Sequence, residues 1–167
     1  MSRGRRTLRV VVPAFTVITV GVLARADAPP DQYTNFDLAD TVIHDNYTNL
    51  SWQRTVSTQT DFNGAVANCN SLSLGTFPSG WRLPSYKELL TLVDESPHWE
   101  YENGPMQVAI DGNAFPGTPV TSNGGNYWSS SVSFGGSVLG VEFGRGTARP
   151  LQTSGSTAYV RCVHDPP

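Results

Sequence analysis

Two cysteines, Cys69 and Cys162, are the residues whose type could do chemistry most directly. In a chain that leaves the cytoplasm, two cysteines placed in regular elements most simply form one disulfide. The alternative is a catalytic thiol, which needs surroundings that lower its pKa. Only His164 lies close in sequence to either cysteine, so the pattern favours a disulfide over a nucleophile.

Histidines and serines are the next candidates for chemistry. The chain has three histidines, with no metal-ligand spacing between them: His44, His98 and His164. We expect them to be solvated or locally hydrogen bonded. The serine run at 129–131 lacks a Gly-x-Ser-x-Gly elbow and an obvious base. The sequence therefore predicts no catalytic residue.

Four acidic residues could bind calcium together: Asp94, Glu95, Glu100 and Glu102. They lack the regular alternation of ligands that a calcium-binding loop shows, so a solvated acidic surface is the preferred interpretation. The chain also has no glycine-rich phosphate loop. We therefore expect no metal and no other cofactor, with calcium kept as the alternative.

Ligand-binding candidates cluster around residues 96–126, a stretch rich in proline and glycine without hydrophobic periodicity. Long irregular loops in compact domains are commonly functional. The predicted ligand-binding residues are two loop aromatics, two asparagines at the loop end and two arginines of the glycine-rich turn at 144–156: Trp99, Tyr101, Asn123, Asn126, Arg145 and Arg149. The alternative for Trp99 is that it only plugs the loop onto the core. The other three tryptophans lie in regular elements and should be buried: Trp52, Trp81 and Trp128.

The N-terminal 26 residues have the pattern of a signal peptide. Arginines precede an apolar run at 10–23. Ala24 and Ala26 occupy the two positions before the cleavage site at which signal peptidase requires small residues. About 14 apolar residues, interrupted by Pro13, fall short of the roughly 20 that span a bilayer. We therefore expect cleavage after residue 26, no membrane span afterwards, and a secreted or periplasmic protein.

Removing this leader makes the chain strongly acidic. Five of the 11 basic residues lie in residues 1–26 and none of the 14 acidic residues do, which leaves a net charge of −8. Such a charge argues against nucleic acid or anionic lipid as a bulk electrostatic partner. A local basic patch stays open because three arginines lie near the C-terminus: Arg145, Arg149 and Arg161.

Strands are predicted at both ends of the expected domain. Residues 27–40 show no periodicity and are interpreted as a linker or a lead-in strand. Residues 41–44 and 50–54 predict a hairpin around a turn rich in Asp and Asn. Further strands are predicted over 126–132, 137–143 and 158–163, with a turn-rich segment at 144–156.

Two helices are predicted between these strands. Apolar spacing from Phe62 to Cys69 indicates a helix that buries Cys69, with either Thr60 or Asp61 as its cap. Ser85 and Glu88 form a capping box for a second helix. Three apolar residues continue its inward stripe: Leu89, Leu92 and Val93. Arg82 lies just before this cap. The sequence leaves two roles open for it, which are pairing with a carboxylate or contacting a ligand.

The motifs in this order resemble a known family. They include "HDNYTNLSWQR" at 44–54, "GWRLPSYKELLTLVD" at 80–94, "NYWSSS" at 126–131 and "AYVRCV" at 158–163. Their sequence and spacing are similar to the bacterial domain family named after the C-terminal domain of the collagen-like adhesin Lcl. The resemblance covers residues 41–164 and leaves 165–167 as a tail.

That family is similar to the C-type lectin-like fold. The resemblance implies an α+β domain with two helices, antiparallel sheets and a long irregular loop region that binds ligand, and a disulfide from the first helix to the last strand. The calcium-dependent sugar motif of animal lectins is absent from this sequence. The implied function is an exported recognition or adhesion domain for a glycan or protein. The alternatives are an enzyme related to the formylglycine-generating class, whose chemistry needs active-site cysteines, and a structural module of an envelope assembly.

Overall fold

The computed structural model describes residues 28–166 except 36, 38, 101–105 and 121–124. The predicted leader and two predicted ligand-binding residues, Tyr101 and Asn123, lie outside the described residues. Within the described part, two five-stranded sheets and one two-stranded sheet combine with two α-helices. This arrangement confirms the α+β class.

The first sheet carries both ends of the described chain. Its strands, in spatial order, are β1 (Tyr33–Asn35), β2 (Val42–Asp45), β3 (Leu50–Gln53), β12 (Val163–His164) and β5 (Trp81–Arg82). The predicted hairpin is confirmed, because β2 and β3 pair antiparallel. Asp45 closes its turn, since its carboxylate accepts from the Tyr47 amide (3.0 Å) and the Thr48 hydroxyl (2.7 Å). Asn49 takes a positive φ of 60°, which asparagine tolerates better than most residues.

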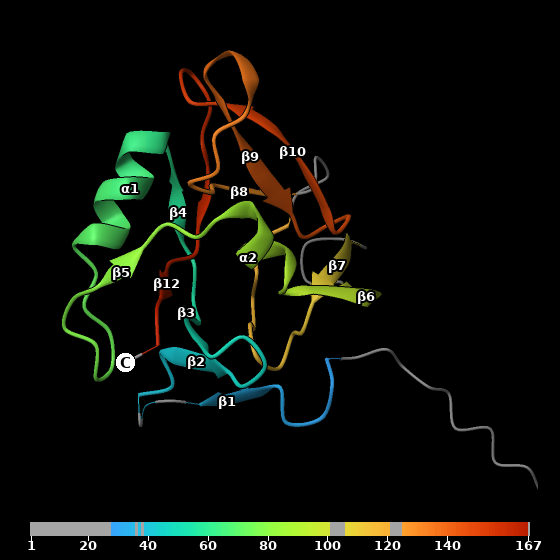
Figure 1. Ribbon diagram of the computed structural model, residues 1–167. Coiled ribbons are helices and arrows are strands. Elements are labelled where there is room, and N and C mark those ends of the chain that lie inside the picture. The colour runs from blue at the N-terminus through green and yellow to red at the C-terminus, as the bar shows by residue number, and fades with distance from the viewer. Residues whose placement is uncertain (1–27, 36, 38, 101–105, 121–124, 167) are drawn as a thin grey trace, which may run out of the picture.

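The second sheet holds the C-terminal hairpin. Its order is β10 (Thr147–Gln152), β9 (Ser137–Glu142), β8 (Asn126–Tyr127), β11 (Ala158–Val160) and β4 (Ser57–Thr60). It is mixed rather than purely antiparallel, because β11 pairs parallel with β8. The expectation of a turn-rich segment at 144–156 is wrong in part, since β10 pairs with β9 along its whole length. Figure 1 shows β9 and β10 at the opposite end of the molecule from β1.

Helix α1 (Phe62–Asn70) begins where its capping residue predicts. The Asp61 side chain accepts from the Gly64 amide (2.7 Å), which decides between the two expected caps. Ala65 and Cys69 are buried on the inward stripe. A short 3₁₀ helix, η1 (Phe134–Gly136), lies between β8 and β9.

Helix α2 (Tyr86–Leu90) has the predicted capping box but is shorter than its apolar stripe suggested. The Glu88 amide donates to the Ser85 hydroxyl (3.2 Å), and the Ser85 amide donates to the Glu88 carboxylate (2.7 Å). The helix ends at Leu90, so Leu92 and Val93 lie beyond it. They are still partly or fully buried, because the chain turns directly into a strand.

The stretch at 96–126 is less irregular than expected. Strand β6 (Val93–Glu100) pairs antiparallel with β7 (Met106–Ile110), although the register shifts between Val93 and His98. Pro97 falls inside this shift, which interrupts the period of two that reveals a strand in sequence. The predicted long loop is therefore partly a hairpin.

Two apolar cores fill the spaces between these elements. One lies around Trp52 and Phe115, and the other lies around Trp128 and the Cys69–Cys162 disulfide. Trp52, Trp81 and Trp128 are buried as predicted. Within the described chain, no helix is long and apolar enough to cross a bilayer.

Candidate functional site

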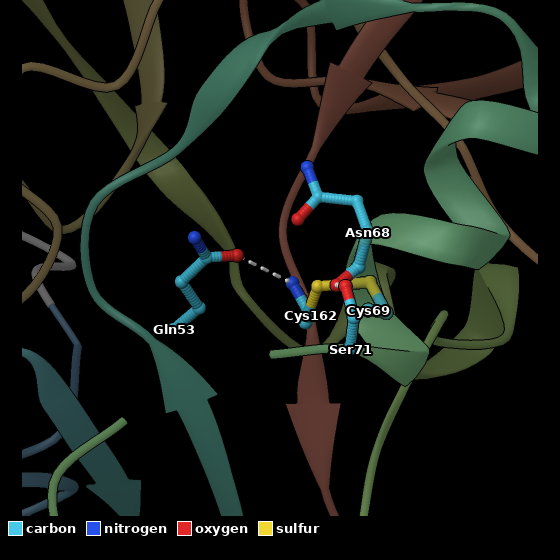
Figure 2. The surroundings of a disulfide bond; sticks show 5 residues. All are labelled: Gln53, Asn68, Cys69, Ser71 and Cys162. Atoms are coloured by element: carbon cyan, nitrogen blue, oxygen red, sulfur yellow. Dashed lines mark hydrogen bonds between the residues drawn. A yellow bond between two sulfur atoms is a disulfide. The ribbon is translucent and has the colours of Figure 1, made fainter. Parts of the chain in front are cut away.

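The predicted disulfide is present and closes the second core. Cys69, at the last turn of α1, is bonded to Cys162, which lies between β11 and β12 rather than inside a strand. Figure 2 shows Gln53 of β3 beside this bond, where its side-chain oxygen accepts from the Cys162 amide (3.1 Å). The bond therefore joins α1 to a segment that is itself hydrogen bonded to the first sheet. Neither cysteine is free to act as a nucleophile.

Three of the predicted ligand-binding residues meet around a carboxylate that the sequence did not single out. Glu142, at the end of β9, has only 2% of its side chain exposed. Arg145 donates from Nη1 to its Oε1 (2.6 Å), and Arg149 Nε lies 3.9 Å from its Oε2. Arg149 Nε also donates to the Asn126 side-chain oxygen (2.8 Å). We call Asn126, Glu142, Arg145 and Arg149 the arginine face.

The two arginines of this face remain available to solvent. The side chains of Arg145 and Arg149 are 59% and 47% exposed, although each is anchored by polar atoms of the domain. A guanidinium group has five N–H donors, so anchoring uses only part of its capacity. The arrangement presents donors in fixed positions, which suits recognition of hydroxyl, carbonyl or carboxylate oxygens.

The elements that hold the arginine face differ from the expectation. Arg145 lies in the turn after β9, as predicted, whereas Arg149 lies in strand β10 rather than in a turn. The register pairs Arg149 with Gly140, and pairs both Asn126 and Thr147 with Glu142. Three neighbouring strands therefore bring these residues together, and their separation in sequence gives no sign of it.

Trp99 lies in β6, whose first residue, Val93, lies against the turn that carries Arg145. The Trp99 side chain is 56% exposed, so it does not plug the loop onto the core. The adjoining strand β7 contacts the turn that carries Arg145, because the Ala109 amide donates to the Phe143 carbonyl (2.6 Å). Gly146 in that turn has a φ of 63°, and a Cβ there would lie 2.8 Å from Val93. The hairpin and the turn are therefore in direct contact.

Arg161 does not contribute to a surface patch, which corrects the idea of three clustered arginines. It is fully buried and donates from Nη1 to the carbonyls of Gln53 (2.8 Å) and Arg54 (2.7 Å) and from Nη2 to the Thr118 hydroxyl (2.8 Å). Its guanidinium lies 4.5 Å from the Phe115 ring centre. Burial lowers the pKa of Arg161. This residue anchors the segment at 115–118 to the frame.

Arg82 has a structural role, which answers the question that the sequence left open. It forms two hydrogen bonds to Glu88 (2.7 and 3.0 Å) and two to Asp165 (2.5 and 3.0 Å). Hydrogen bonds from Arg82 are the largest cause that lowers the pKa of Glu88 and of Asp165, and they raise the pKa of Arg82 itself. Arg82 therefore links the capping box of α2 to the C-terminal segment.

Sequence reasoning missed Glu142 because it expected only one buried face in the strand predicted at 137–143. The alternation of Leu139, Val141 and Phe143 predicts that face, which would place Glu142 in solvent. Both faces of β9 are buried instead. The glycines on either side of Arg145 signal a tight turn, but they do not signal a buried acid beside it.

The side chains that most often bind metals do not gather among the described residues. No group of three or more His, Cys, Asp or Glu side chains comes together in a way that could hold a metal ion there. His164 instead stacks on Phe77, with ring centres 4.2 Å apart. Asp94 and Glu95 line a cleft, which is described below.

Fold and site together define an α+β domain with a single disulfide, two capped helices and polar residues gathered on a hairpin at one end. The chain belongs to the family of the Lcl C-terminal domain, whose family model matches residues 41–164. Comparison with curated proteins and with solved structures finds no match.

Proposed function

We propose that the protein is an exported recognition domain with a C-type lectin-like fold, which binds a glycan or a protein ligand through the arginine face and through Trp99 on the adjoining β6–β7 hairpin. The observation that carries this proposal is the pair of half-exposed arginines that one buried carboxylate and one asparagine hold in place. Side chains held in place before binding lose less conformational entropy when the ligand arrives.

The chemistry of this surface suits a ligand rich in oxygen atoms. Arg145 and Arg149 can donate to hydroxyl or carbonyl oxygens, and arginine is enriched among the residues that dominate binding energy. An exposed indole such as Trp99 can cover a flat apolar face, such as that of a sugar ring or a peptide side chain. The disulfide supports an extracytoplasmic location, because disulfides persist mainly in oxidising compartments.

The alternative functions make different demands on the chain. Enzymes of the formylglycine-generating class use active-site cysteines, and both cysteines of this chain are joined in the disulfide. That pairing supports a binding role over oxidative catalysis. A purely structural module of an envelope assembly would need no ligand at the arginine face.

A glycan array and a panel of envelope proteins, probed with the exported protein, test the proposal. We expect Trp99→Ala and Arg149→Ala to weaken binding by about tenfold or more, which corresponds to roughly 1.4 kcal/mol. Tyr47→Ala and Lys87→Ala are the matched controls, because both side chains are exposed and lie outside the arginine face. Equal losses in the controls, or redox turnover of a substrate by the protein, would contradict the proposal.

A further inference from the structure

Two clefts flank the segment that leads into β1, the strand that Figure 1 shows at the opposite end of the molecule from β9 and β10. Their volumes are about 270 and 280 Å³. They share five lining residues: Ala28, Pro29, Gln32, Tyr33 and Asp111. One cleft continues along residues 91–95, and the other continues towards Asn113 and Ala114. We call this pair the lead-in clefts.

Acidic side chains give the lead-in clefts a single sign of charge. Asp94, Glu95 and Asp111 line the first cleft, and Asp31 and Asp111 line the second. Among the described residues that line either cleft, there is no Lys, Arg or His. Asp111 is held in place, because its Oδ1 accepts from the amides of Asn113 (2.8 Å) and Ala114 (2.9 Å). The clefts are therefore suited to a positively charged group.

A glutamine in the wall of both clefts supports the same conclusion from a second observation. Gln32 is only 9% exposed, and its backbone is fully used: its amide donates to Pro29 (3.0 Å) and its carbonyl accepts from Asn46 (2.8 Å). Its side-chain amide makes no hydrogen bond to the described residues, and neither amide atom is among the fully buried side-chain atoms that lack a partner. The amide therefore reaches solvent where Gln32 lines the clefts. A ligand in the clefts could replace the water that solvates it.

Tyr33 adds an aromatic wall to this negative environment. Its ring packs edge-on against Phe115, with ring centres 5.2 Å apart. Burial raises the pKa of Tyr33 most, and the carboxylates of Asp45, Asp111 and Asp94 raise it further against the opposing charge of Arg161. The phenol therefore stays neutral, and its ring can contact the methylene chain or the positive charge of a ligand.

We propose that the lead-in clefts bind a primary ammonium group, supplied either by a small organic amine or by a lysine side chain of a peptide. An ammonium has three donors, which the Gln32 oxygen and the carboxylates at the walls can accept. Ca²⁺ needs six to eight oxygen ligands, whereas the acidic residues described here do not converge into a metal-holding group. None of the described residues that line the clefts belongs to the arginine face.

Titration of the exported protein with 1,5-diaminopentane, followed by NMR chemical shifts or calorimetry, tests the inference. The control is 1,5-pentanediol, which has the same length and no charge. An acetylated and amidated Gly-Lys-Gly peptide forms the second arm. Binding of the diamine shows that the free amine suffices, and binding of the peptide alone identifies a protein source. Equal binding of the diol, or no binding of diamine and peptide, overturns the inference.

Substitutions then locate the site. Glu95→Gln and Asp111→Asn should each weaken amine binding by about three- to fivefold, because each removes one partly solvated charge. Asp61→Asn is the matched control, since Asp61 also accepts backbone hydrogen bonds and lies outside the clefts. An equal loss in Asp61→Asn would mean that only overall charge matters, and would refute the site.

Gln32→Met separates binding from stability. The change keeps the approximate volume and removes the amide that faces the clefts, so the melting temperature should change little while amine affinity falls. A lower melting temperature with unchanged affinity would show that Gln32 is structural and that the clefts do not use it.

Discussion

Replacing Arg145 by Met should destabilise the domain through the buried carboxylate of Glu142. Arg145 gives Glu142 its closest hydrogen bond (2.6 Å), while the Arg149 Nε atom lies 3.9 Å away. Removing one partner of a buried ion pair leaves the other charge poorly compensated, and a lost hydrogen bond to a charged group costs about 1.5–3 kcal/mol. Since Arg145 itself is largely solvated, we expect a loss of about 2 kcal/mol.

A double-mutant cycle in urea measures this coupling. Arg145→Met should shift the unfolding midpoint down by about 1 M, given a slope of roughly 2 kcal/mol per molar urea. Glu142→Met alone should cost less, because it leaves only an exposed arginine without a partner. The double variant should lie close to the wild type, since no charge is then left buried. Equal costs of Arg145→Met with and without Glu142 would refute the reasoning.

Two further predictions concern the frame. Replacing Cys69 and Cys162 together by Ser should lower the free energy of unfolding by about 4–5 kcal/mol in the chain-entropy account, given the separation of 93 residues, and chemical denaturation checks it. Arg82 lowers the pKa values of Glu88 and Asp165 in the folded state. The two ionised carboxylates therefore stabilise the fold fully at a pH above their unfolded-state pKa values of about 4, and this stabilisation is lost as the pH falls through their lower folded-state pKa values. The acid-unfolding profile of Glu88→Gln should therefore be shallower than that of the wild type, and parallel profiles would contradict this.

Local chemistry explains which parts of the fold were predictable. The helix caps at Asp61 and Ser85 are formed by hydrogen bonds between residues three positions apart, so both caps can be predicted from the local sequence alone. The inward stripe of α1 and the disulfide follow from spacing and cysteine count. Strand β10 was missed because most of it is exposed and it contains Pro150, so pairing with β9 rather than apolar alternation defines it.

The candidate site was only partly predictable, because its geometry depends on strand register. Arg145 and Arg149 could be selected as residue types that bind ligands, and the structure does bring them together with Asn126. Their common anchor, Glu142, depends on how β8, β9 and β10 align, which no local pattern encodes. Gln32 was missed for a related reason, since only tertiary packing buries most of a glutamine in a segment rich in proline and aspartate.

Charge decides how the two proposed sites would select ligands. The expected exported chain carries a net charge of −8, which attracts amines and repels anions at long range. That field fades over roughly 8 Å at physiological ionic strength, so contacts at the arginine face act only at close range. Neutral, hydroxyl-rich ligands therefore meet no long-range barrier there, whereas strongly anionic ones do. Binding at the arginine face should depend weakly on salt, and binding in the lead-in clefts should weaken clearly as salt rises.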